Sequence, residues 1–78
     1  MVTAEDILAG LEKLDQQIVR LLEERKRLVA QIPGGLDPEQ DLEIMSLWID
    51  EAVERELDES TMEKMGKLIS QLCRRRGE

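Results

Sequence analysis

The sequence predicts an all-α protein of three helices, at about residues 4–32, 38–56 and 59–75, in one domain that spans residues 1–78. Three observations support this class. Leu, Glu, Lys, Arg, Ile and Met are abundant while Trp48 is the only aromatic residue, which is typical of helical bundles and coiled coils. Apolar residues recur at spacings of three and four, and no segment has the pattern of a strand. Proline and glycine mark the boundaries between the helices.

The first helix is expected to begin after Thr3, a suitable N-cap, and to end before Pro33 and the two glycines that follow it. Its apolar stripe has heptad spacing and consists of Ile7, Leu11, Leu14, Ile18, Leu21, Leu28 and Ile32. Arg25 occupies one slot of this stripe. A helix of about 29 residues is roughly 43 Å long, too long for the rest of one chain to cover. We therefore expect a homodimer that forms through the first helix.

The second and third helices have clear start signals. Asp37 is an N-cap, Pro38 suits the first helical position, and Gln40 can complete a capping box. The expected inward residues of this helix are Leu42, Met45, Ile49, Ala52 and Val53, with Trp48 at the border. The third helix is expected to open near Asp58 or Ser60 and to bury Met62, Met65, Leu68, Ile69, Leu72 and Cys73.

Composition and charge exclude several functions. A formal charge of −7 argues against nucleic acid as a partner, because phosphate binding needs a broad basic face. Cys73 is the single cysteine and histidine is absent, so we expect no internal disulfide and no metal site, and we interpret Cys73 as a core residue. We find no signal peptide and no membrane span, and expect a cytoplasmic protein that needs no cofactor.

Arg25 has two interpretations. A lone arginine on an apolar stripe can fix the register of a coiled coil, or extend its guanidinium to water or to an acidic side chain. Alternatively, a guanidinium inside a helical bundle is a bidentate clamp for a carboxylate, and the lowered dielectric strengthens it. The pattern alone leaves both open.

The order of one long and two shorter helices resembles the all-helical (AroQ class) chorismate mutases. Leu14-Asp15 and the segment Leu21-Leu22-Glu23-Glu24-Arg25 are similar to that family's first helix. DPEQDLE, at 37–43, resembles the start of its second helix, and GKLISQLC, at 66–73, resembles its third. The resemblance covers nearly the whole chain. It implies an intertwined homodimer whose sites take residues from both chains, and a chorismate-like dicarboxylate as ligand.

The resemblance places Arg25 at the family's mid-helix arginine and Glu39 at its glutamate of helix two, as candidate substrate-binding residues. Chorismate mutases rearrange chorismate to prephenate without a cofactor. Their sites hold the dicarboxylate in its compact form and stabilise the negative charge that grows on its ether oxygen. This reaction therefore requires several cations around the substrate.

Most of the other family positions depart from this pattern. The arginine expected early in helix one falls on Leu8, and the arginine before Glu39 falls on Pro38. The family's serine and glutamine of helix three fall on Cys73 and Gly77. Its lysine late in helix one has no counterpart, because the segment between Arg25 and Glu39 is shorter than usual. We therefore expect weak or absent mutase activity, since the loss of one such donor costs about a hundredfold or more in rate.

Substitute cations could restore part of the lost charge. The candidates lie on or after the third helix, with Arg74 and Lys67 foremost, followed by Lys64, Arg75 and Arg76. The alternative function is then an active chorismate mutase, or an isochorismate pyruvate lyase, with a rearranged site. The main expectation is a weak or inactive mutase-like protein that serves as a dimeric interaction or ligand-sensing module, with any protein partner unknown. A plain helical dimerisation protein is the third possibility.

Overall fold

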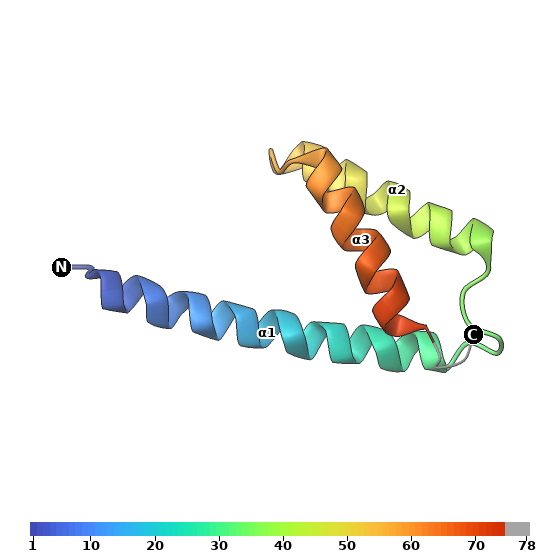
Figure 1. Cartoon of the computed structure of the whole chain (residues 1–78), viewed down its shortest axis with the longest axis horizontal. Coiled ribbons are helices and arrows are strands. Elements are labelled where there is room, and N and C mark those ends of the chain that lie inside the picture. The colour runs from blue at the N-terminus through green and yellow to red at the C-terminus, as the bar shows by residue number, and fades with distance from the viewer. Residues whose placement is uncertain (75–78) are drawn as a thin grey trace.

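The computed structural model describes residues 1–74 and contains three helices: α1 at Ala4–Ala30, α2 at Pro38–Glu54 and α3 at Glu59–Cys73 (Figure 1). The described part of the chain has no strands, so the predicted all-α class is confirmed. All three helices begin at the predicted residues. Each ends two residues earlier than predicted, because the last turns are replaced by other hydrogen-bonding patterns.

Side-chain caps fix the three helix starts. The Thr3 hydroxyl accepts from the amide of Asp6 at 3.2 Å, and the Asp6 carboxylate accepts from the amide of Thr3 at 3.0 Å. Asp37 and Gln40 form the predicted second capping box, at 2.8 and 3.1 Å. Each reciprocal pair satisfies backbone donors that have no partner within the helix. The helix starts are therefore determined by residues three apart in the sequence.

Asp58 caps α3 with a different pattern. Its carboxylate accepts from the amide of Thr61 at 2.8 Å and from the hydroxyl of the same residue at 2.6 Å. The Thr61 hydroxyl and then its backbone amide hold the pKa of Asp58 below its ordinary value of 3.8, since both bonds favour the charged carboxylate. The charged form of Asp58 therefore stabilises the start of α3.

Two different turns end the first two helices. After α1 the amides of Gln31 and Ile32 each donate to a carbonyl three residues back, at 3.1 Å. Gly34 and Gly35 then reverse the chain with φ of 78° and 76°. After α2 the amide of Leu57 bonds the carbonyl of Ala52 at 2.8 Å, and Glu56 has φ of 56°. This second turn is a Schellman motif in which a glutamate takes the left-handed position that glycine usually occupies.

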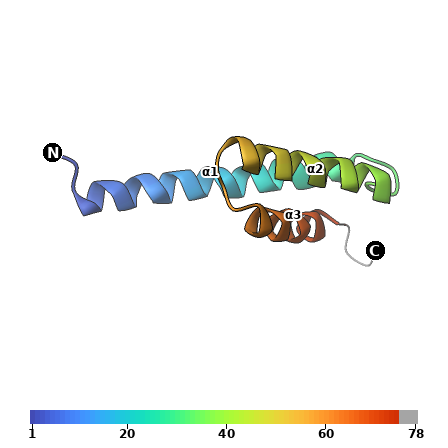
Figure 2. The same ribbon diagram turned by 90° about the horizontal axis from the view of Figure 1, so that it is seen from above.

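The helices form an open arrangement (Figures 1 and 2). α2 and α3 pack together as a hairpin, and α3 also contacts α1, whereas α2 and α1 share no contact. The end of α3 meets α1 near its C-terminal end, and the first half of α1 extends away from the hairpin. The molecule accordingly measures 51 × 25 × 16 Å.

The core lies where α3 meets the other two helices and is small. Val29, Ala52 and Cys73 are its buried hydrophobic side chains within the described residues, which agrees with the interpretation of Cys73 as a core residue. Gly66 is also buried, and a Cβ there would lie 3.0 Å from Sδ of Met45. The close approach of α2 to α3 therefore requires glycine or a shift of the Met45 side chain.

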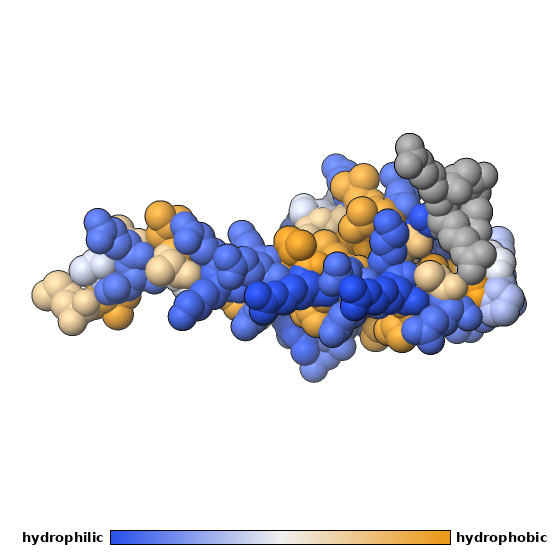
Figure 3. All heavy atoms as spheres, turned by 90° about the horizontal axis from the view of Figure 1, so that it is seen from below, coloured by the Kyte–Doolittle hydropathy of each residue, from blue (hydrophilic) through white to orange (hydrophobic). Residues whose placement is uncertain are grey.

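Much of the expected core is exposed in the single chain. Leu42, Val53 and Leu68 keep 69%, 57% and 62% of their surfaces accessible, and Met65 and Leu72 are also exposed. The same holds for the first five residues of the α1 stripe: Ile7, Leu11, Leu14, Ile18 and Leu21. On the face that Figure 3 shows, apolar areas lie among the polar side chains along the molecule. Helical spacing correctly marks an apolar face, but one chain does not cover it.

None of the described helices combines the length and the apolar character needed to cross a bilayer.

Candidate functional site

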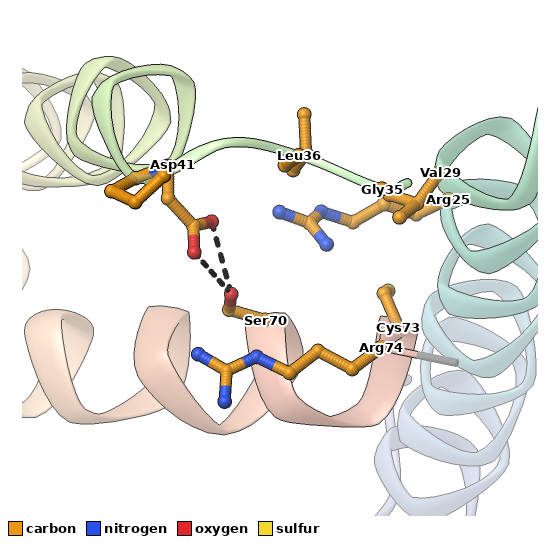
Figure 4. A pocket seen from close by; sticks show the side chains of 9 residues that line it. Arg25, Val29, Gly35, Leu36, Asp41, Ser70, Cys73 and Arg74 are labelled. Atoms are coloured by element: carbon orange, nitrogen blue, oxygen red, sulfur yellow. Dashed lines mark hydrogen bonds between the residues drawn. The ribbon is translucent and has the colours of Figure 1, made fainter. Parts of the chain in front are cut away.

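A cavity of about 300 Å³ lies where the end of α3 meets α1 and the loop that leads to α2 (Figure 4). All three helices and this loop contribute to its wall. The lining residues are Arg25, Val29, Gly35, Leu36, Pro38, Asp41, Ser70, Cys73 and Arg74. The short Pro33-Gly34-Gly35 connection positions the site, because its two left-handed glycines bring Leu36 and the start of α2 back over α1.

Arg25 projects from α1 into this cavity, toward Asp41 and Ser70 (Figure 4). Its Nη1 atom is buried and has no hydrogen-bond partner among the described residues. No ion pair joins Arg25 to an acidic residue in that part of the chain. A buried donor without a partner is costly, more so when it carries charge. The arrangement supplies an unused charged donor that faces a cavity.

Asp41 faces Arg25 from the first turn of α2 and is held by α3. The Ser70 hydroxyl donates to Oδ1 of Asp41 at 3.0 Å and lies 3.2 Å from Oδ2 (Figure 4). A carboxylate has about four acceptor sites, so one shared hydroxyl proton leaves most of its capacity free. The cavity thus contains a positioned anion as well as cations.

The structure brings together two of the four predicted site residues. Arg25 and Arg74 line the same cavity. Lys67 instead lines an adjoining hollow and pairs with Glu63 at 3.1 Å. Glu39 is exposed, does not line the cavity and forms no ion pair with Arg25.

The positions that depart from the mutase pattern also have clear locations. Pro38 and Cys73 do line the cavity, but neither side chain offers a cation. Leu8 lies on the extended half of α1, outside the cavity wall, and is 57% exposed. The candidates Arg75 and Arg76, and the position Gly77, lie outside the described residues. Arg25 and Arg74 are therefore the two cations that the described residues place around the cavity.

Sequence reasoning missed Asp41 and Ser70 as site residues. Asp41 is one of several acidic residues in the segment 37–63, and an acidic residue in the first turn of a helix is common because it interacts favourably with the helix dipole. Ser70 lies 29 residues away in the sequence, on a helix whose inward face was judged by apolar residues alone. Neither residue carries a local signal, because their pairing depends on how α2 and α3 cross.

Within the described residues, no three histidine, cysteine or acidic side chains are grouped so that they could hold a metal ion.

Comparison of the chain with protein-family models, with curated proteins and with solved structures found no match.

Proposed function

We propose that this chain is a chorismate mutase-like helical protein that forms a homodimer through α1 and binds a carboxylate ligand at Arg25, with weak or no mutase activity. Such a protein would serve as a ligand-sensing or interaction module. The observation that carries the proposal is the buried, unpartnered Nη1 of Arg25 in a cavity that residues of all three helices line. A guanidinium that only anchors the fold normally has its buried donors satisfied.

The charges around the cavity support binding without fast catalysis. Chorismate brings two carboxylates and develops further negative charge on its ether oxygen. The described wall offers Arg25 and Arg74, and it adds the negative charge of Asp41. Electrostatic stabilisation of the transition state is usually the largest contribution to such catalysis, and here it is partly cancelled.

The exposed stripe of α1 supports the dimer. Ile7, Leu11, Leu14 and Ile18 are each half exposed or more, on a part of α1 that extends away from the hairpin. Burial of apolar surface contributes about 25 cal/mol per Å², so pairing of two such stripes is favourable. A second chain would cover the apolar face that the first cannot.

An active enzyme with a rearranged site is the second candidate function, and Arg74 favours it. Its side chain lines the Arg25 cavity from the end of α3, as a substitute cation would. Lys67 does not support this alternative, because Glu63 holds it beside the adjoining hollow.

The rate at which chorismate absorbance falls in the presence of purified protein distinguishes the weak or inactive mutase-like protein from the active enzyme. We expect a rate close to the uncatalysed background, unchanged in Arg25→Ala. A turnover of about 1 per second or faster, in the ordinary enzyme range, would show an active enzyme if Arg25→Ala abolished it. Arg27→Ala is the matched control, since Arg27 lies two residues along α1, is exposed, and pairs with Glu23 at 3.4 Å.

A further inference from the structure

The Arg25 cavity contains opposite charges that do not neutralise each other. Arg25 and Asp41 both line it, yet no ion pair joins them, and Asp41 is bonded by the uncharged hydroxyl of Ser70. Ser70 fixes the direction of the carboxylate without using its charge. One end of the cavity therefore favours an anionic group and the other a cationic group.

We propose that the cavity binds the zwitterionic head group of an α-amino acid, with its carboxylate on Arg25 and its ammonium group on Asp41. This inference rests on the proposed ligand-binding function and names its ligand class. A dicarboxylate would place its second anion against Asp41, and a simple amine would leave Arg25 without a partner. A zwitterion satisfies both groups with charge-assisted hydrogen bonds, which are the stronger kind.

Arg74 adds a second cation to the cavity wall. It lines the cavity together with Arg25 and forms no ion pair with the described residues. The Arg74 guanidinium extends past Ser70, apart from that of Arg25 (Figure 4). Two guanidinium groups and one carboxylate give the cavity wall a net positive charge. The carboxylate of the ligand should therefore contribute more to binding than its ammonium group.

The adjoining hollow indicates the kind of side chain that the ligand carries. This hollow, of about 490 Å³, shares Pro38, Asp41, Ser70 and Arg74 with the cavity. Its further wall includes Leu42 and Met45, and Leu42 is 69% exposed. A ligand whose head group lies between Arg25 and Asp41 would place its side chain over this apolar surface. An unbranched or branched aliphatic side chain, as in leucine or methionine, fits this surface by burying Leu42.

Isothermal titration of the whole protein with L-leucine, 4-methylpentanoate and 3-methylbutylamine tests the assignment. The second compound lacks the ammonium group and the third lacks the carboxylate. We expect L-leucine to bind, and each deletion to weaken binding by about tenfold to a hundredfold, as for other hydrogen bonds to charged groups. L-methionine should bind like L-leucine.

Two variants connect this preference to the cavity. Arg25→Ala should remove the binding of L-leucine, whereas the control Arg27→Ala should retain it. Asp41→Asn, which conserves shape and can still accept from Ser70, should reduce the preference for L-leucine over 4-methylpentanoate by about tenfold or more. Circular dichroism checks that each variant folds. If a variant does not fold, the comparison of the three ligands on the unaltered protein still tests the assignment.

The possible failures are distinguishable. If 4-methylpentanoate or chorismate binds as tightly as L-leucine and requires Arg25, the zwitterion assignment is overturned and the carboxylate-binding function stands. If none of these ligands binds, both are overturned.

Discussion

Ser70 and Asp41, 29 residues apart in the sequence, join α3 to the first turn of α2 through a hydroxyl–carboxylate hydrogen bond of 3.0 Å. Six further side-chain hydrogen bonds in the described chain lie at the helix starts and connect residues three apart. The Ser70 bond thus differs in linking two helices. It also fixes the carboxylate that faces Arg25.

Ser70→Ala should therefore lower the free energy of unfolding by about 1 kcal/mol, the usual contribution of one hydrogen bond. Urea denaturation followed by Trp48 fluorescence measures this at a fixed chain concentration. Ser46→Ala is the matched control, since Ser46 is exposed in α2, and it should change stability by less than about 0.5 kcal/mol. Equal effects of the two substitutions would show that the bond contributes nothing.

Glu56→Gly should stabilise the protein. Glu56 has φ of 56°, a left-handed conformation that costs roughly 1 kcal/mol for a residue with a Cβ and little for glycine. We expect a gain of about 0.5 to 1 kcal/mol in denaturant unfolding. Glu43→Gly removes the same charge from an exposed position inside α2 and should cost about 1 kcal/mol. A loss of stability in Glu56→Gly would contradict the claim that the left-handed backbone conformation of Glu56 costs free energy.

The exposed stripe of α1 should hold two chains together. Sedimentation equilibrium is expected to give twice the mass of the 9.0 kDa chain. The double substitution Leu14→Asp and Ile18→Asp places charge in the centre of the stripe and should yield monomers. Gln16→Asp, on the opposite face of α1, should leave the dimer intact. A monomer at micromolar concentration in the unaltered protein would overturn the proposed dimer.

The cap of α3 should weaken in acid. Because the folded pKa of Asp58 lies below its ordinary value of 3.8, the charged cap stabilises the fold above that pH and loses its effect as pH falls through the folded pKa. The melting temperature of Asp58→Ala should therefore lie below that of the unaltered protein at neutral pH. The difference should shrink as pH falls below 3.8.

Thr61→Val provides the control for this acid effect. It removes the hydroxyl that makes the largest contribution to the lowered pKa of Asp58 and keeps the backbone donor. Its melting-temperature difference should be smaller than that of Asp58→Ala and shrink over the same pH range. A difference for Asp58→Ala that stays constant down to low pH would contradict the role of the charged carboxylate.

The parts of the fold that local chemistry determines could be predicted from the sequence. Thr3, Asp37 and Asp58 act as N-caps, and the helix starts follow from them. The helix ends were predicted two residues too long, because the closing bonds of Gln31 and Ile32, and the left-handed Glu56, have weak sequence signals. Exposure of Leu42 and Leu68 was not predicted, since spacing identifies an apolar face without showing what covers it.

The sequence predicted some residues of the candidate site and missed others. Arg25 was identified because a charge on an apolar stripe breaks a local pattern. Arg74 was among the possible substitute cations, and it does line the cavity. Asp41 and Ser70 could not be identified, because each is an ordinary helix residue until the packing of α2 on α3 brings the two together. Lys67 was a plausible cation by sequence position, but Glu63 pairs with it.

If Arg25 serves a ligand and not the fold, its guanidinium should destabilise the unliganded protein. The free energy of unfolding of Arg25→Met, measured without added ligand, separates these two roles. Methionine retains the length of the side chain and removes a buried charged donor that has no partner. The substitution should therefore raise the free energy of unfolding, by about 1 kcal/mol or more. A loss of about 1 kcal/mol or more would show that Arg25 is a structural residue with a satisfied guanidinium, and would contradict the proposed ligand site.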